Sequence, residues 1–247
     1  MARQSSFIKL EGTIGDVTFY KGKNGYNARQ KGGVPKSRIM NDPSFQRTRE
    51  NLAEFARAAT SSKFLKDAFR EITLRSRDLR THNRLYSTAL RVIKSDPTSK
   101  RGERIIANGD ITIFNGFQFS YNAMWESTVF VPFTVDNGTS DVTVNLNDFV
   151  PSKMLANPQG ATHFRLFLVN AAVDFTEEVY RSQSIVGPEM PINITPVTGF
   201  SLALTKLGLA GHTDFYAIGV EFLQEVNGDF YDLNDRTHNA AKIILID

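Results

Sequence analysis

The sequence predicts an α+β protein in which an N-terminal β-hairpin arm and short basic helices precede an antiparallel β-sandwich. Three observations lead to this prediction. Apolar residues follow a helical spacing between residues 41 and 96, and they alternate with polar residues, as in strands, from Ile105 onward. An Asn-Gly pair lies between two short extended runs near the N-terminus. Basic residues gather in the first part of the chain and acidic residues in the second.

Residues 1–40 are expected to form the arm and its connector. Val17 and Phe19 alternate with more polar neighbours, and a second extended run follows the turn. The Asn-Gly pair supplies the positive φ angles that a tight hairpin turn requires. A lone two-stranded hairpin is marginally stable in water, so this one must pack on its own protein or on a neighbour. The predicted assembly arm therefore comprises Val17, Phe19, Tyr20, Asn24, Gly25 and Tyr26.

Residues 41–96 are predicted to form a basic helical region. Asp42 and Pro43 have the side chains of a helix start, an N-cap followed by proline in the first turn. Leu52 and Phe55 then belong to an apolar helical face, and a second helix is expected to start near residues 61–62. A third is expected over about 78–95. The segment 97–104, PTSKRGER, has the composition of a linker between two separately folded halves.

Residues 105–247 are predicted to form the β-sandwich. Val142, Val144 and Leu146 alternate with polar residues, which is typical of a strand that buries one face. The runs 129–135 and 216–222 show the same alternation. About seven to nine such runs, separated by Gly, Pro, Asn and Asp, indicate an antiparallel sandwich.

The charges divide sharply along the chain. Residues 1–104 contain 23 Lys and Arg against 10 Asp and Glu, whereas residues 105–247 contain 6 against 16. Such asymmetry is typical of proteins that bind nucleic acid, and also of subunits whose basic part meets the acidic part of a neighbour. A plain solvated face is a further reading, because long arginine stems also cover apolar surface. The candidate contacts to phosphate or to an acidic partner are Arg75, Arg77, Arg80, Arg84, Arg91 and Lys94.

Motifs for chemistry are missing from the sequence. There is no cysteine, no Gly-x-Ser-x-Gly, no His-Glu-x-x-His and no phosphate-binding loop, and the four histidines are scattered. We therefore predict a protein that is not an enzyme, with no catalytic residue, no metal site, no cofactor and no small-molecule substrate. No run approaches the roughly 20 apolar residues that span a bilayer. We expect no membrane partner, and a location in the cytoplasm or in a virion-like particle assembled there.

Two stretches carry a resemblance to a known group of proteins. The N-terminal FIKLEGTIGDVTFYKGKNGYNARQKGG and the C-terminal FLQEVNGDFYDLNDRTHNAAKIILID resemble an uncharacterised protein family of Bacteroidota. The resemblance covers nearly the whole chain. It implies no activity, and no catalytic or ligand residue can be mapped from it.

These observations favour two hypotheses about function. The first is a self-assembling structural protein, a subunit of a phage-like particle, tube or filament, whose partner is another copy of itself. Arm exchange and the complementary charges of the two halves would hold it together. The alternative is a nucleic-acid-binding protein that uses the basic helical region on phosphates. A carbohydrate-binding sandwich with exposed aromatics such as Trp125 or Tyr231 is a third and weaker reading.

Overall fold

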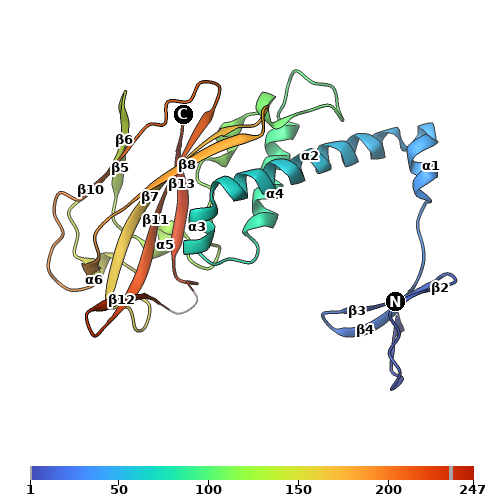
Figure 1. Cartoon of the computed structure of the whole chain (residues 1–247), viewed down its shortest axis with the longest axis horizontal. Coiled ribbons are helices and arrows are strands. Elements are labelled where there is room, and N and C mark those ends of the chain that lie inside the picture. Colours follow the sequence, from blue (N-terminus) through green and yellow to red (C-terminus); the bar gives the residue numbers. More distant parts are fainter. Residues whose placement is uncertain (1, 234–235) are drawn as a thin grey trace. The chain divides into compact units, whose positions relative to one another are not determined.

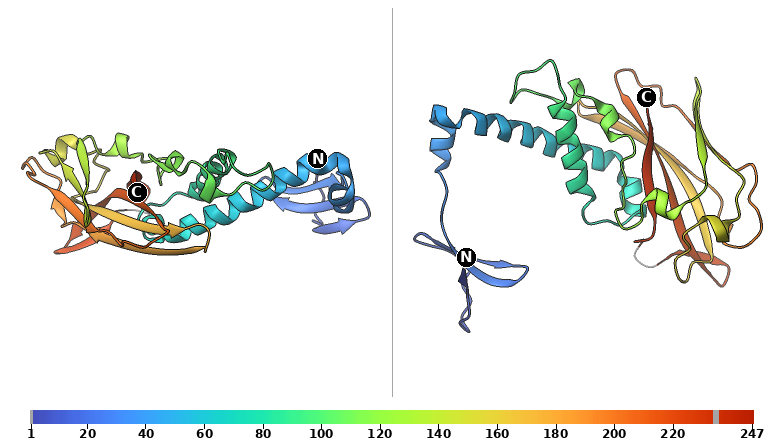
Figure 2. Two further views of the ribbon diagram at one scale, coloured as in Figure 1. Left: turned by 90° about the horizontal axis from the view of Figure 1, so that it is seen from above. Right: turned by 180° about the vertical axis from the view of Figure 1, so that it is seen from behind.

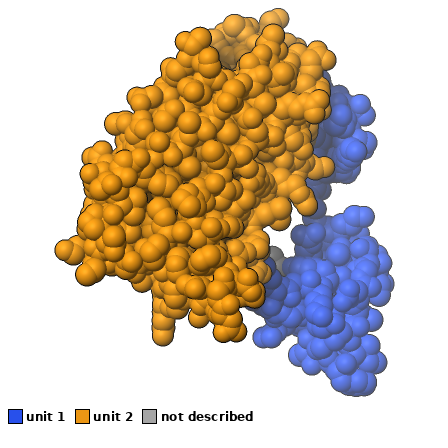
Figure 3. Space-filling model, turned by 60° about the vertical axis from the view of Figure 1, so that its left-hand side comes forward, with its two compact units in different colours: residues 1–49 blue, residues 50–247 orange. Residues whose placement is uncertain are grey.

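The structure is a computed structural model of the chain, and it describes residues 2–233 and 236–247. The chain divides into two compact units, residues 1–49 and residues 50–247, which Figure 3 shows in different colours. The first unit contains the arm. The second contains most of the long helix that begins at Gln46, all later helices and the other two sheets.

The arm is a four-stranded antiparallel sheet followed by two short helical segments (Figure 1). The predicted hairpin is present, and two further short strands flank it in the order β1-β4-β3-β2. Within the described turn of this hairpin, only Gly25 has a positive φ angle, 102°. The elements are β1 (Ala2–Arg3), β2 (Gly12–Ile14), β3 (Val17–Gly22), β4 (Gly25–Gln30), α1 (Lys36–Asn41) and the 3-10 helix η1 (Pro43–Phe45).

Three helices form the next layer: α2 (Gln46–Ala68), α3 (Arg70–Arg75) and α4 (Thr81–Lys94). Asp42 caps the 3-10 turn before α2 by accepting a hydrogen bond from the Ser44 amide, as expected for a helix start. The predicted break at residues 61–62 is wrong, because the Ser62 hydroxyl is buried and donates to the Ala59 carbonyl within one continuous helix.

The buried face of α2 also differs from the prediction. Leu52 is 49% exposed and Phe55 is 40% exposed, so the helical face that they share is turned to solvent. The face turned to the core instead contains Glu54, Ala58, Ser62, Leu65 and Ala68. The prediction of a helix for this segment is therefore correct. The prediction of which helical face is buried is wrong.

Two antiparallel sheets follow, so the predicted α+β class and its sandwich are confirmed. The smaller sheet has the order β10-β6-β5 and comprises β5 (Phe133–Asn137), β6 (Asp141–Leu146) and β10 (Ser201–Thr205). The larger has the path β12-β11-β7-β8, and its long strands, orange to red in Figure 2, run side by side. It comprises β7 (His163–Asp174), β8 (Val179–Val186), β9 (Met190–Pro191), β11 (Thr213–Val226), β12 (Asp229–Asp232) and β13 (Ala240–Ile246). Short helical turns occupy the connections: η2 (Ile106–Asn108), η3 (Ile111–Phe114), α5 (Trp125–Thr128) and α6 (Pro151–Met154).

The larger sheet is the central layer of this unit, because each of its faces is covered by a different core. Alternate residues of a strand point to opposite faces. On β7, Phe167 and Val169 pack with α2, α3 and α4, whereas Leu166 and Leu168 pack with the smaller sheet. Gly219 lies directly opposite Phe167, whose ring would stand 2.0 Å from a β-carbon at that position. Glycine is therefore required for the ring to lie flat on the strand.

The domain boundary predicted at 97–104 is corrected by the structure. Helices and sheet share one core, and the compact unit begins at residue 50. The segment 97–104 is held against α2: Glu54 Oε1 accepts from the Gly102 amide at 2.9 Å, and Arg57 Nη1 donates to the Gly102 carbonyl at 2.5 Å. Side chains nearly 50 positions earlier thus satisfy backbone groups that a free linker would expose to water.

Candidate assembly interface and basic surface

The arm sheet has one apolar and one polar face, as its register requires. Residues directly opposite each other in an antiparallel pair share a face, and neighbours along a strand do not. Val17 pairs with Ile14, and the side chains of these two residues share one face of the sheet. Tyr20 pairs with Asn27, and these two side chains share the opposite face. We call the first side the apolar arm face; it contains Ala2, Ile14, Val17, Phe19, Tyr26 and Ala28, together with the polar side chains of Lys21 and Gln30. The polar face contains Arg3, Thr13, Thr18, Tyr20, Asn27 and Arg29.

The predicted arm residues therefore lie in two groups. Val17, Phe19 and Tyr26 belong to the apolar arm face, with the Lys21 ammonium 5.5 Å from the Tyr26 ring centroid. Tyr20 was expected to be buried together with Val17 and Phe19, but it lies on the polar face below the guanidinium of Arg29. A single contact surface cannot use consecutive residues of one strand, so Tyr20 is not part of the apolar arm face.

The remaining two predicted arm residues, Asn24 and Gly25, form the end of the hairpin. Asn24 is exposed in the turn, and Gly25 opens β4. Their positions fix the register of β3 against β4, with Gly22 opposite Gly25. They shape the arm and contribute no apolar surface.

The arm has no core of its own. None of the described residues 2–49 is buried, although a four-stranded sheet with an apolar face normally covers that face. Ile14 is 64% exposed, and Phe7, in the loop between β1 and β2, is 94% exposed. Residues 1–33 contain six lysines and arginines against two acidic residues. The apolar arm face is thus an uncovered surface on a basic segment.

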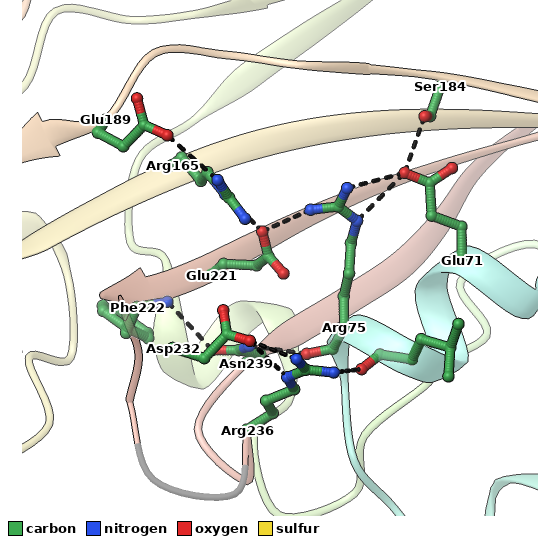
Figure 4. A network of polar contacts seen from close by, with 11 residues as sticks. Glu71, Arg75, Arg165, Ser184, Glu189, Glu221, Phe222, Asp232, Arg236 and Asn239 are labelled. Carbon is green, nitrogen blue, oxygen red and sulfur yellow. Dashed lines mark hydrogen bonds and ion pairs between the residues drawn. The ribbon is translucent and has the colours of Figure 1, made fainter. Parts of the chain in front are cut away.

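Arg75, a predicted phosphate contact, belongs to a charge network between α3 and the larger sheet (Figure 4). Its Nη1 donates to Glu221 Oε2 at 2.6 Å, and its Nη2 donates to Glu71 Oε1 at 2.9 Å. The Glu221 side chain, on β11, is 2% exposed. Arg165 on β7 donates from Nε to the same Glu221 oxygen at 2.7 Å. Arg75 is therefore a structural residue that neutralises a buried carboxylate.

The outer members of this network complete its hydrogen bonding. Ser184 donates to Glu71 Oε1 at 2.8 Å, and Glu189 accepts from Arg165 at 3.1 Å. Burial opposes the charge of Arg165, but the hydrogen bonds and charges of Glu221 and then Glu189 outweigh it, so the pKa of Arg165 is raised. Buried charges are tolerated when they are paired and hydrogen-bonded in this way.

The backbone at the end of α3 is fixed by a second group of contacts in Figure 4. Arg236 is paired with Asp232 and donates from Nη1 to the Leu74 carbonyl at 2.6 Å. Asn239 donates to the Arg75 carbonyl at 2.7 Å and accepts from the Phe222 amide at 3.1 Å. These contacts attach α3 to the segment that precedes β13, and they hold Arg75 in place.

Arg84 has an equally structural position. Its Nη1 contacts Asp78 Oδ2 at 2.6 Å, and its Nη2 donates to the carbonyls of Gln118 and Phe119, each at 3.0 Å. Burial alone would raise the pKa of Asp78, but hydrogen bonds from the Arg80 amide, the Arg84 side chain and the Tyr121 amide lower it overall. Arg84 therefore joins α4 to the segment before α5.

The other four predicted basic residues, Arg77, Arg80, Arg91 and Lys94, are exposed. The Arg77 amide donates to the Arg236 carbonyl at 3.3 Å. Arg80, Arg91 and Lys94 make no ion pair with any residue in the described part of the chain. The predicted basic face thus separates into two structural arginines and a set of solvent-facing cations.

Several residues of these surfaces were not singled out from the sequence. Ile14 extends the apolar arm face, and the short alternating run before Gly15 was the signal for its strand. Glu221 interrupts the apolar run 215–223 of β11, which is the usual mark of a buried, paired charge. Of the two aromatics considered for a glycan site, Trp125 is 2% exposed within the core and Tyr231 is 55% exposed.

Among the described residues, no group of three or more His, Cys, Asp or Glu side chains is arranged to hold a metal ion. None of the described helices combines the length and apolar character that a transmembrane segment needs. No protein-family model, curated protein or solved structure matches this chain. The resemblance to a Bacteroidota family stays a prediction.

Proposed function

We propose that this protein is a self-assembling structural protein, such as a subunit of a phage-like particle, tube or filament formed in the cytoplasm. In this proposal the apolar arm face of one copy packs against a neighbouring copy. The observation that supports it most is the apolar arm face itself: the sheet collects its apolar side chains on one side, and no described residue of the arm is buried. An exposed apolar sheet face of this kind is typical of an interaction surface.

For one arm contact, the free energy gained by burying apolar side chains is similar in size to the free-energy cost of association. Full burial of an exposed apolar side chain contributes about 1.5–3 kcal/mol. Ile14 is 64% exposed, Val17 is 36% exposed and Phe19 is half-buried, so burying all three contributes less than the roughly 4.5–9 kcal/mol of three fully exposed side chains. Association costs on the order of 4–15 kcal/mol in lost freedom of the two bodies. A single arm contact is therefore weak, and a stable assembly requires each copy both to donate its arm and to receive another.

Charge favours an acidic acceptor over a second arm. Two arms packed face to face would bring together two segments that each have an excess of basic residues. Residues 105–247, in contrast, contain 6 basic and 16 acidic residues. We therefore propose that the arm meets the acidic, β-rich part of its neighbour, with charge accelerating the encounter and apolar contact providing the affinity.

A matched pair of variants tests this proposal. The triple substitution Ile14→Ser, Val17→Ser and Phe19→Ser removes the apolar arm face. The control replaces three exposed apolar residues that lie outside both the arm and the proposed acceptor: Leu52→Ser, Leu74→Ser and Leu79→Ser, at positions that are 49%, 53% and 90% exposed. Light scattering after size-exclusion chromatography should show that the arm variant loses the large species and that the control keeps it. Equal behaviour of the two variants would refute the role of the apolar arm face.

A further inference from the structure

A groove lies beside α4 and the loop that precedes it, and the proposed assembly function does not use it. Three adjoining hollows of about 330, 350 and 380 Å³ form the groove. The first and second share Tyr121 in their walls, and the second and third share Arg77, Asp78 and Leu79. All of these residues belong to the unit that begins at residue 50.

The groove has a clear excess of positive charge. Lys66, Arg70, Arg80 and Arg91 line it and make no ion pair with a described residue. Its acidic members are Asp67 and Asp78, and Asp78 is already neutralised by Arg84 at 2.6 Å. A row of solvent-facing cations in a concave surface attracts a polyanion, and phosphodiester chains are the commonest such ligand.

The same groove presents apolar surface to solvent. Tyr121 is 64% exposed and Leu79 is 90% exposed. The Tyr121 main chain is held by a hydrogen bond from its amide to Asp78 Oδ2 at 2.9 Å, and the Arg84 guanidinium lies 6.0 Å from its ring centroid. The backbone that carries the exposed ring is therefore joined by Asp78 to the loop that lines the groove. Nucleobases stack on aromatic rings placed beside cations, and they do so only where the bases are unpaired.

We infer that this groove binds single-stranded nucleic acid without strong sequence preference. Phosphates contact Lys66, Arg70, Arg80 and Arg91, and a base stacks on Tyr121. Duplex nucleic acid fits the exposed ring less well, because its base faces are already stacked inside the helix. The binding is separate from assembly through the arm, since no groove residue belongs to residues 1–49.

Fluorescence anisotropy of the full-length protein with labelled oligothymidine over a series of salt concentrations tests the inference. A plot of the logarithm of the binding constant against the logarithm of the salt concentration should have a slope of about −3. This value follows from four phosphate contacts at about −0.7 each. Substituting Arg70→Gln, Arg80→Gln and Arg91→Gln should weaken binding and flatten the slope to about −0.7. Tyr121→Ala should weaken binding by roughly 5- to 150-fold at an unchanged slope, because it removes stacking and no charge.

A control variant with the same loss of charge separates the groove from a general charge effect. Lys100→Gln, Lys153→Gln and Arg181→Gln are exposed and lie outside the groove, so binding should stay close to that of the unmodified protein. If this control weakens binding as much as the groove variant does, the groove assignment is overturned. Equal affinity for duplex, together with no effect of Tyr121→Ala, would overturn the single-strand assignment. Light scattering of the same variants should show unchanged assembly, and a loss of assembly would show that the groove and the arm act together, contrary to the inference.

Discussion

Arg75 provides a sharp test of the distinction between structural and solvent-facing arginines. Arg75→Gln would remove the 2.6 Å contact to Glu221, whose side chain is 2% exposed, and the contacts to Glu71. It would also remove the guanidinium that lies 5.2 Å from the Phe167 ring centroid. Breaking a buried pair costs about 3–5 kcal/mol when the remaining charge has no other partner.

The expected loss is smaller here for two structural reasons. Glu221 keeps Arg165 as a partner at 2.7 Å, and the Arg75 side chain is 21% exposed. We therefore expect Arg75→Gln to lower the free energy of unfolding by about 2–3 kcal/mol. For a unit of this size the melting temperature should fall by roughly 4–12 °C.

Urea titration followed by tryptophan fluorescence is the appropriate assay. Trp125 is the single tryptophan and is 2% exposed, so its emission reports on the unit that contains the network. The control Arg91→Gln should change the free energy of unfolding by less than about 0.5 kcal/mol. The double variant Arg75→Gln, Glu221→Gln should lose less free energy of unfolding than the two single variants lose together, because it no longer contains the buried negative charge. A loss below about 0.5 kcal/mol for Arg75→Gln, at an unchanged urea dependence, would refute this reasoning.

Three further predictions concern the fold and its boundaries. Gly219→Ala should lower stability by about 2–3 kcal/mol through overpacking against Phe167, and adding Phe167→Leu should recover part of the loss; no recovery would contradict this contact. Burial first, and then the charges of neighbouring carboxylates, raise the pKa of Tyr216 from 10.0 to about 12. The protonated Tyr216 hydroxyl therefore makes its full contribution to the free energy of unfolding below pH 10, and this contribution is lost as the pH rises towards 12. Tyr216→Phe should abolish the part of the pH dependence of unfolding that comes from this group. Trypsin should cut within 31–38 before 97–104, because the latter segment is held by α2, and earlier cleavage at 97–104 would contradict that attachment.

The local features of the fold were predictable from the sequence. The hairpin, the Asp42 cap and the alternation of Val142, Val144 and Leu146 each depend on residues close together in the chain. The sequence was equally sufficient to place Val17 and Phe19 on one side of a strand. It was not sufficient to give the width of the arm sheet, because β1 is only two residues long and pairs with β4 across the whole hairpin.

The failed predictions for Arg75, for the boundary at 97–104 and for Leu52 share one physical cause, which is contact between residues far apart in the chain. Glu221 and Arg75 are 146 positions apart, so no local pattern could show that this arginine is neutralised. Composition predicted 97–104 as a linker between two halves, but hydrogen bonds from Glu54 and Arg57 of α2 hold this segment against the helix. The exposed position of Leu52 likewise depends on which side of α2 meets the sheet.

Deletion of residues 1–33 tests the central claim, assembly through the arm, most directly. Every buried residue in the described part of the chain lies at or after Glu54, so the truncated protein should keep its circular dichroism spectrum and its cooperative unfolding. Multi-angle light scattering and negative-stain microscopy should then find only monomers where the full chain forms large species. Large species that persist without residues 1–33, or a truncated chain that does not fold, would contradict the claim.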